Sequence, residues 1–221
     1  MNEQYYDETY FEWQKEMGAF GGWADLIKFE DFITPDMNVI DFGCGGGFIL
    51  NNLNCKNKIG IEINDIARNN AINLGIKAFK FSEDVPNNWA DCIISNHALE
   101  HVPDPLHQIL ILKSKLKLGG KIIFVVPCDT IKYKFKPNDI NNHLYSWSPM
   151  NLGNLFVEAG YAVIESKTYI HKWPPFHQQI ARIFGKHIFN LICRIYGRIE
   201  TSWYQIRIIA EKKTNSFFWH I

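Results

Sequence analysis

The sequence lacks the features that would place the protein in a membrane, outside the cell or on nucleic acid. It has no run of about 18 apolar residues that could span a bilayer. Its N-terminus is acidic and polar where a signal peptide would be basic and then apolar. Its 23 Lys and Arg balance its 23 Asp and Glu, so the excess of basic charge typical of nucleic-acid binding is missing. We therefore expect a cytoplasmic protein with no nucleic-acid partner.

Paired cysteines are also missing. The five cysteines are far apart, and no two form a Cys-x-x-Cys pair: Cys44, Cys55, Cys92, Cys128 and Cys193. This spacing disfavours a structural zinc or redox site and fits a reducing compartment. The acids Asp129 and Asp139 have no convincing third ligand nearby in the sequence, so we expect no metal.

What is present is an ordinary core-forming composition. The 221 residues are 47% apolar, which predicts a single globular domain over 1–221 that needs no disulfide for stability. The neutral total hides an asymmetry, because residues 1–36 carry nine acids and two bases whereas 167–221 carry two acids and nine bases. The two ends could therefore face each other or separate partners.

Short β-rich runs alternate with helical stretches from Met37 to Val126, which is typical of an α/β protein with a parallel sheet. The pattern predicts strands at 37–42, 57–62, 76–81, 90–95, 120–126, 161–169 and 203–212. It predicts helices at 46–53, 65–74, 104–117 and 148–158. The third helix is expected to close on Gly119 and Gly120, a common helix stop.

Two helical segments flank the predicted core of residues 37–170. Residues 9–33, within an N-terminal cap of 1–36, read as one or two helices broken between Gly18 and Gly22. An insertion at 171–202, before the last strand, contains an amphipathic helix at 176–199. Its apolar face is Phe176, Ile180, Ile183, Phe184, Ile188, Leu191, Ile192, Ile195, Tyr196 and Ile199, opposite Arg182, Lys186, Arg194 and Arg198. It could be a lid, a homodimer surface, or a peripheral contact with an anionic membrane.

The most informative segment is a glycine loop, Asp41-Phe42-Gly43-Cys44-Gly45-Gly46-Gly47, between a buried strand and a helix. Glycines there let backbone N–H groups approach a ligand. Glu62 ends the next strand, where its carboxylate can accept both hydroxyls of a ribose. A dinucleotide loop would need a glycine at Phe48, so pyrophosphate binding is disfavoured. The acid Asp41 instead favours a ligand with a positive amino group.

This combination resembles the class I S-adenosylmethionine-dependent methyltransferases over residues 37–170. The Glu100-His101-Val102-Pro103-Asp104-Pro105 segment also matches that family, within its small-molecule subgroup. The resemblance implies a Rossmann-like, seven-stranded, mostly parallel sheet with helices on both faces and an antiparallel last strand. It also implies S-adenosylmethionine as cofactor, bound by Asp41, Gly43, Cys44, Gly45, Gly47, Glu62, Ile63, Ser95 and Asn96, with Glu83 near the adenine.

The acceptor is expected beyond the carboxyl ends of the strands, where ligands bind in open α/β folds. His97 and His143 are candidates for a general base or a substrate ligand, since histidine exchanges protons near neutral pH. Tyr145, Trp147 and His101 are candidate substrate contacts, although each could equally be structural. Lys132, Lys134 and Lys136 could attract an anionic acceptor, but solvated lysines are the commoner explanation.

The predicted function is methyl transfer from S-adenosylmethionine to an oxygen or nitrogen of a small molecule, for which a sugar or surface-glycan precursor is one suggestion. Two alternatives remain open. The chain could be a catalytically inactive S-adenosylmethionine-binding partner subunit, or a nicotinamide-dependent oxidoreductase, against which Phe48 argues.

Overall fold

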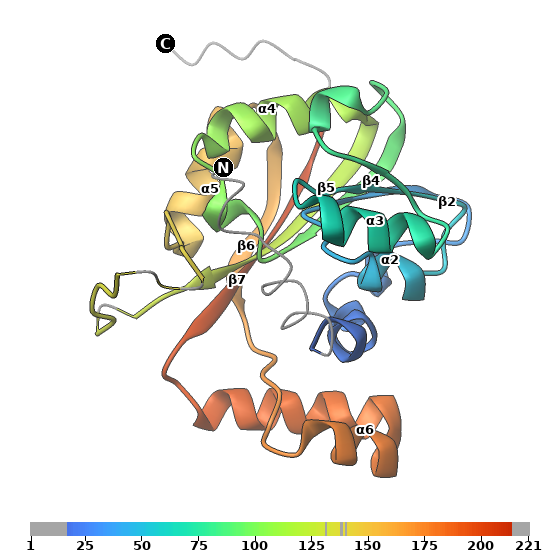
Figure 1. Cartoon of the computed structure of the whole chain (residues 1–221). Coiled ribbons are helices and arrows are strands. Elements are labelled where there is room, and N and C mark those ends of the chain that lie inside the picture. Colours follow the sequence, from blue (N-terminus) through green and yellow to red (C-terminus); the bar gives the residue numbers. More distant parts are fainter. Residues whose placement is uncertain (1–16, 131, 138, 140, 214–221) are drawn as a thin grey trace.

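A computed structural model describes residues 17–130, 132–137, 139 and 141–213 (Figure 1). Seven strands form one sheet in the order β3-β2-β1-β4-β5-β7-β6. They are β1 (Asn38–Phe42), β2 (Asn57–Ile61), β3 (Lys77–Phe79), β4 (Ala90–Asn96), β5 (Leu116–Cys128), β6 (Ala162–Tyr169) and β7 (Tyr204–Glu211). The first five strands pair in parallel, and β7 runs antiparallel to both β5 and β6. The predicted fold class is confirmed.

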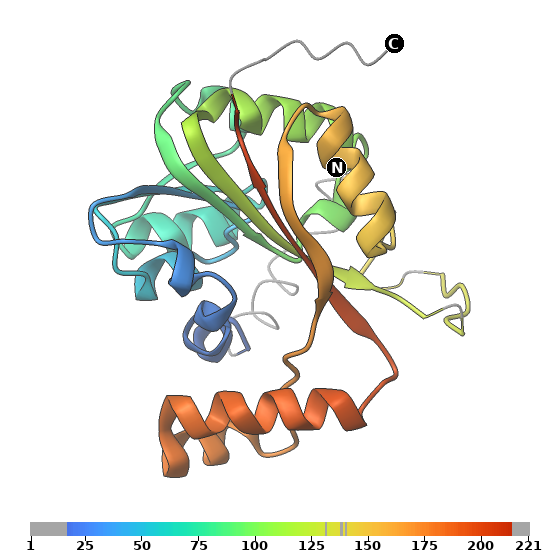
Figure 2. The same cartoon turned by 180° about the vertical axis from the view of Figure 1, so that it is seen from behind.

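Helices cover both faces of the sheet (Figures 1 and 2). One core lies under α4 (Pro105–Lys115) and α5 (Pro149–Glu158). The other lies under α2 (Phe48–Asn52), α3 (Asp65–Asn73), η2 (Asp25–Lys28) and η3 (Glu30–Phe32). Successive side chains of a strand point to opposite faces, so Phe124 enters the first core and Val125 the second. Burial on both faces explains the near-continuous apolar runs of the central strands.

The predicted end of the third helix at Gly119 and Gly120 is wrong. The helix α4 ends at Lys115, and Leu116 is already extended and pairs with Ala90 of β4. Gly119 has φ of 77° within β5, and its N–H donates to the carbonyl oxygen of Lys212. Pairing with the neighbouring strand, rather than a helix cap, therefore sets the conformation here.

The predicted break between Gly18 and Gly22 is also wrong, because residues 17–24 form a continuous helix. A Cβ atom on Gly18 would lie 2.6 Å from the Phe48 ring, and one on Gly22 would lie 2.5 Å from the Phe48 carbonyl oxygen. The glycines therefore let this helix cross close to the start of α2. Tyr10 and the rest of the predicted segment before residue 17 lie outside the described residues.

The helix α6 (His177–Ile199) matches the predicted amphipathic helix but is kinked at Gly185, whose φ of 72° and ψ of 178° are not helical. It lies away from the sheet and beside the helix of residues 17–24 (Figures 1 and 2). Phe189 and Cys193 of α6 are buried there against Ala24. No described helix is long and apolar enough to cross a membrane.

The apolar face of α6, for which a lid, a homodimer surface and a membrane contact were left open, is largely exposed. Its exposed apolar residues, defined here as the outer stripe, are Ile183, Phe184, Ile188, Leu191, Ile195 and Ile199. Lys186, expected on the opposite, solvated face, instead forms an ion pair with Glu30 of η3. The acidic N-terminal segment and the basic C-terminal segment thus meet in the fold.

Candidate cofactor and acceptor site

The turn after β1 has the conformation that its glycines permit. Gly43, Gly45 and Gly47 have φ values of 72°, 52° and 80°, which residues with a Cβ atom rarely adopt. Asp41, two residues before the turn, is 2% exposed. Burial, and then the charge of Glu62, raise the pKa of the Asp41 carboxyl well above its usual range. A positively charged ligand group beside Asp41 would oppose that shift and favour its ionised form.

Glu62 follows β2 and bends toward this turn. One carboxylate oxygen accepts from the Gly45 N–H at 2.9 Å, and the other accepts from the Asn64 N–H at 2.8 Å. Burial raises the pKa of Glu62, whereas these two N–H donors lower it. Arg68 donates to the carbonyl oxygen of Glu62 at 2.9 Å and fixes the backbone on the other side. The carboxylate is therefore held in a defined orientation beside the glycine turn.

The helix of residues 17–24 forms a wall over the turn. Met17, Gly21 and Gly22 line the same cavity as Gly43 and Gly45. Trp23, on the same helix, packs against Phe189 of α6, with ring centroids 5.6 Å apart. The insertion thus supports the wall rather than lining the cavity at that point.

A buried polar network joins this wall to the sheet. Lys28 of η2 is 3% exposed, and its ammonium donates to the side-chain oxygens of Asn96 and Gln205, both at 2.9 Å. It also pairs with Asp25 at 3.1 Å. The side chain of Asn96, a predicted cofactor-binding residue, is thus occupied by Lys28 and Asp25. The sequence reading missed Lys28 and Gln205, since a single Lys or Gln carries no local signal of burial.

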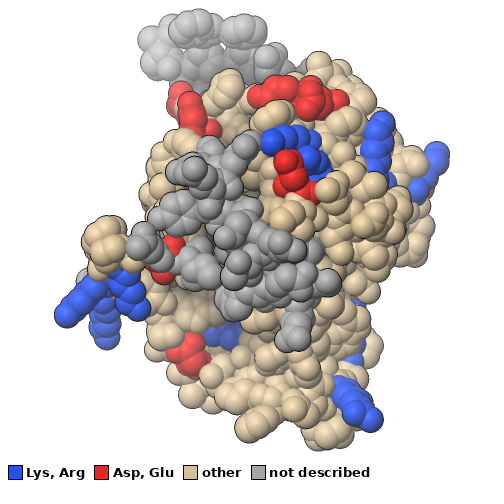
Figure 3. Space-filling view, in the orientation of Figure 1, with Lys and Arg blue, Asp and Glu red and all other residues tan. Residues whose placement is uncertain are grey.

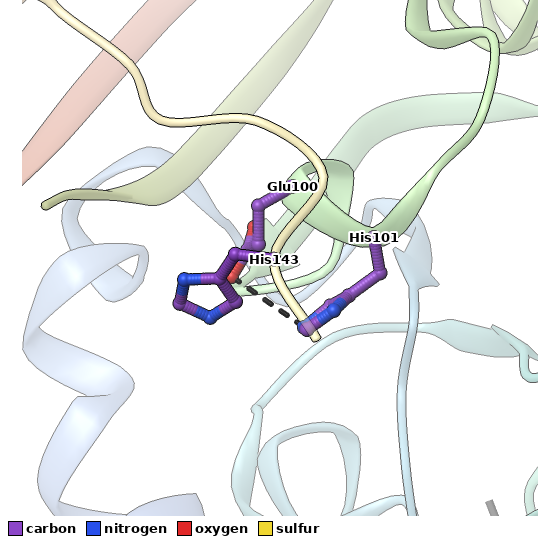
Figure 4. A group of neighbouring side chains, drawn as sticks. All are labelled: Glu100, His101 and His143. Atoms are coloured by element: carbon purple, nitrogen blue, oxygen red, sulfur yellow. Dashed lines mark ion pairs between the residues drawn. The ribbon is translucent and has the colours of Figure 1, made fainter. Parts of the chain in front are cut away.

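Three histidines and one glutamate gather after β4. His97 has a φ of 57° and approaches the Gln205 amide oxygen through Nε2 at 3.1 Å. Its Nδ1 lies 3.5 Å from Oε1 of Glu100, which also lies 3.8 Å from Nε2 of His101. Figure 4 shows His143 reaching the same place from the β5–α5 loop, with its ring 5.1 Å from that of His101.

Backbone bonds explain how His143 arrives there. The N–H groups of Leu144 and Tyr145 donate to the carbonyl oxygen of Glu100 at 2.9 and 3.2 Å. Nδ1 of His143 lies 3.0 Å from a carboxylate oxygen of Asp129, which orients the ring. Burial lowers the pKa of the neighbouring His101 imidazole, so its neutral form is favoured.

The residues around the cavity include eight of the predicted site residues: Asp41, Gly43, Cys44, Gly45, Asn96, His97, His101 and His143. The others do not line it. Glu62 lies directly beside the lining, since its partly exposed side chain accepts from the N–H of the lining residue Gly45. Ser95 donates to the Phe42 carbonyl oxygen and ties β4 to β1. Trp147 is 6% exposed in the α4–α5 core, and Tyr145 stacks on it and donates to the Pro103 carbonyl oxygen. Gly47, Ile63 and Glu83 also lie outside the lining.

The cavity measures about 1300 Å³. Small-molecule pockets typically span about 300–1,000 Å³, so there is space for two ligands side by side. Its lining includes both the glycine turn and the three histidines. Lys134 and Lys136 of the β5–α5 loop also border it, and Figure 3 shows Lys and Arg side chains gathered over that loop.

Sequence comparison relates the chain to known enzymes. A family profile for a methyltransferase domain matches residues 14–166. Ubiquinone biosynthesis O-methyltransferases of Yersinia pestis and Yersinia pseudotuberculosis are 29% identical over 101 residues, which is 40% of this chain. The match spans 42% of those relatives' own length.

Solved structures share the fold. A SAM-dependent methyltransferase from Archaeoglobus fulgidus is 19% identical with a TM-score of 0.60, over 86% of this chain and 92% of its own. Geranyl diphosphate C-methyltransferase from Streptomyces coelicolor A3(2) is 15% identical with a TM-score of 0.58, over 85% of this chain and 75% of its own. At such identities the likeness concerns the fold alone.

Proposed function

Because the chain belongs to the class I S-adenosylmethionine-dependent methyltransferases, we propose that it transfers a methyl group from S-adenosylmethionine to an oxygen or nitrogen of a small molecule. The observation that carries this proposal is the position of Glu62, whose carboxylate is held by the Gly45 and Asn64 N–H groups beside the glycine turn. A sugar or a surface-glycan precursor remains our suggestion for the acceptor.

The proposed roles follow from the chemistry of each residue. S-adenosylmethionine supplies a methyl group on a positively charged sulfur, which the acceptor displaces in line. The Glu62 carboxylate binds ribose hydroxyls, and Asp41, buried at the end of β1, binds the positive amino group. The glycine turn offers backbone N–H groups without side chains in the way. Orientation and exclusion of water are the protein's main contributions to such a displacement.

The histidine cluster would serve the acceptor. His143 has Nδ1 beside Asp129, so its Nε2 is left to accept a proton or a hydrogen bond from an acceptor hydroxyl. His97 borders the same part of the cavity. Tyr145 and Trp147, which do not line the cavity, would act on the acceptor only by supporting the loop that carries His143.

A direct assay separates this proposal from its two rivals. The protein is incubated with S-adenosylmethionine labelled in the methyl group and a mixture of sugars, phenols and amines. We expect a labelled product whose mass exceeds that of its acceptor by one CH₂. Cofactor binding without any product over a broad acceptor set would favour the inactive partner subunit. Binding of NADH in place of S-adenosylmethionine would favour the oxidoreductase.

We also propose that the outer stripe of α6 lies on an anionic lipid surface. The stripe is apolar and exposed, and the exposed Arg194 and Arg198 lie directly before its residues Ile195 and Ile199 on the same helix. Among the nine bases of residues 167–221, Lys167, Lys172, Lys186 and Arg207 pair with acids of this chain. The exposed Arg194 and Arg198 are the ones that favour a negatively charged partner. An apolar stripe with a basic flank is the pattern of helices that lie in a membrane interface.

Liposome co-sedimentation tests this contact. The full chain should sediment with vesicles containing phosphatidylglycerol, and much less with phosphatidylcholine vesicles. The double variant Arg194→Glu/Arg198→Glu should lose most of the binding, whereas the control Lys56→Glu/Lys77→Glu should keep it. Two results together would refute the lipid proposal and favour a homodimer. The native protein would not bind anionic vesicles, and it would form a dimer that Ile188→Glu dissociates.

A further inference from the structure

Glu100 is a fully buried carboxylate that forms no hydrogen bond with any residue the structure describes. Its exposed fraction is 0%, and neither of its carboxylate oxygens has a hydrogen-bond partner in the part of the chain that the structure describes. The nearest imidazole nitrogens, on His97 and His101, are 3.5 and 3.8 Å from Oε1. An ionised carboxylate without compensation costs several kcal/mol to bury. A positive charge next to Glu100 would therefore stabilise its ionised carboxylate.

Two histidines complete a set of ligands around that carboxylate. Glu100, His101 and His143 each offer one ligand atom, and these atoms lie within 4.8 Å of one another. Figure 4 shows the three side chains converging, two from η5 (Leu99–His101) and one from the β5–α5 loop. Ligands at about 2.0–2.2 Å from an ion stand some 3–4 Å apart, so small side-chain rotations would close the set.

The surroundings of His143 resemble those of a metal-binding histidine. Its Nδ1 lies 3.0 Å from Asp129, and a carboxylate on one ring nitrogen is the usual partner of a histidine that binds metal through the other. The loop carrying His143 is fixed to η5 by the Leu144 and Tyr145 N–H groups. The sequence expectation of no metal considered Asp129 as a ligand, whereas here it orients one.

We propose that Glu100, His101 and His143 bind a divalent transition-metal cation that holds an acceptor hydroxyl. Imidazole and carboxylate together suit Zn²⁺ or Fe²⁺ better than Mg²⁺ or Ca²⁺. Three protein ligands leave a coordination position open, and all three residues border the cavity. The cation would also compensate the buried charge of Glu100.

The role of this cation rests on the proposed methyl transfer and narrows its acceptor to an oxygen. A hydroxyl bound to the cation is more acidic than a free one. Its proton leaves to solvent, and the oxygen forms a bond to the methyl carbon. The carbon–sulfur bond breaks with its electron pair remaining on sulfur. In this arrangement His143 acts through the cation rather than as the base itself.

Cobalt provides a spectroscopic test. The full chain is treated with a chelator and titrated with Co²⁺, followed by visible absorption and by calorimetry. We expect one Co²⁺ per chain with nitrogen and oxygen ligands. Glu100→Gln and His143→Ala should each weaken binding at least roughly tenfold, and Asp129→Asn should weaken it about 10- to 100-fold. His107→Ala, an exposed histidine on α4, should bind as the native chain does.

The outcomes of this test are distinct from those of the cofactor assay. No stoichiometric Co²⁺ binding, or binding unchanged in both Glu100→Gln and His143→Ala, would overturn the metal site. Circular dichroism checks that each variant folds. If Glu100→Gln does not fold, His143→Ala still tests the site, because His143 is partly exposed and its replacement disturbs the core less. Co²⁺ binding by a chain that does not bind S-adenosylmethionine would retain the site and refute the proposed function. Methyl transfer that persists unchanged in chelator would refute the cation's role.

Discussion

At the scale of the residue, the site rests on two carboxyl groups at neighbouring strands, of which Asp41 is buried and Glu62 is partly exposed. Asp41 lies in β1 and Glu62 directly after β2, and burial raises the pKa of both. Two backbone N–H groups stabilise the ionised form of Glu62, whereas the charge of Glu62 raises the pKa of Asp41 further. The protein therefore places two carboxyl groups, whose ionised forms are costly here, where a cationic ligand group is expected.

This arrangement predicts an unusual pH dependence for the ligand-free protein. Because the pKa of Asp41 is raised on folding, the folded state holds that proton to higher pH than the unfolded chain does. The stability contributed by Asp41 is therefore present below an aspartate's ordinary pKa of about 4 and is lost as pH rises through the raised value. Asp41→Asn should remove this loss.

Urea unfolding of the native chain and of Asp41→Asn at a series of pH values measures the effect. The stability of the native chain relative to the variant should fall as the pH increases above about 4. Parallel curves for the two proteins would contradict the raised pKa. The variant should also bind S-adenosylmethionine more weakly, since a neutral amide attracts the amino group less than a carboxylate does.

Individual residues were predictable where local backbone geometry constrains them. The glycine turn could be predicted because positive φ values favour glycine, and the place of Glu62 because a parallel sheet brings successive strand ends together. Lys28, Gln205 and Glu100 were not predicted as site residues. Lys28 meets Gln205 across 177 positions of sequence, and no local pattern reports such a contact.

At the scale of the element, the helix of residues 17–24 depends on small residues where it crosses α2. A Cβ atom at Gly22 would lie 2.5–2.6 Å from the backbone and side chain of Phe48. Gly22→Ala should therefore push the helix away from the glycine turn and open the cavity wall. We expect a lower S-adenosylmethionine affinity with a smaller effect on the folding of the sheet.

Gly153→Ala is the matched control for this prediction. Gly153 lies within α5, and a Cβ atom there would meet Ser166 at an ordinary 3.6 Å. Alanine in a helix is favoured over glycine by up to about 1 kcal/mol, so this variant should be as stable as the native chain or more so, with unchanged binding. Calorimetry and thermal unfolding of both variants give the comparison, and native-like affinity in Gly22→Ala would show that the wall does not matter.

Elements were predictable in kind but not in every boundary. Asn64 and Ser148 cap α3 and α5 with side chains that accept backbone N–H bonds, a role that Asn and Ser commonly take at helix starts. The end of α4 was misplaced because the glycines after it lie in a strand. The packing side of α6 was also unpredictable, since its buried seam of Phe189 and Cys193 is less apolar in sequence than its outer stripe.

At the scale of the whole molecule, the order of the strands in the sheet determines which turns line the cavity. The strands β1 and β4 are neighbours at the centre of the sheet, so the turns that follow them share one cavity. The long insertion between β6 and β7 lies on the other side of the N-terminal helix and supports it. Strand and helix periodicity predicted the overall α/β architecture. The contact between the N-terminal helix and the insertion was indicated in the sequence only by the opposite charges of the two ends.

The central claim is that Glu62 and the glycine turn bind S-adenosylmethionine, and a calorimetric titration of that ligand tests it most directly. The native chain should bind one equivalent, as should Glu158→Ala, which removes an exposed acid at the end of α5. Glu62→Ala should lose about 1.5–3 kcal/mol through its missing charged hydrogen bonds, or roughly 10- to 150-fold in affinity. Equal affinity in Glu62→Ala and the native chain, or no binding by either, would contradict the account.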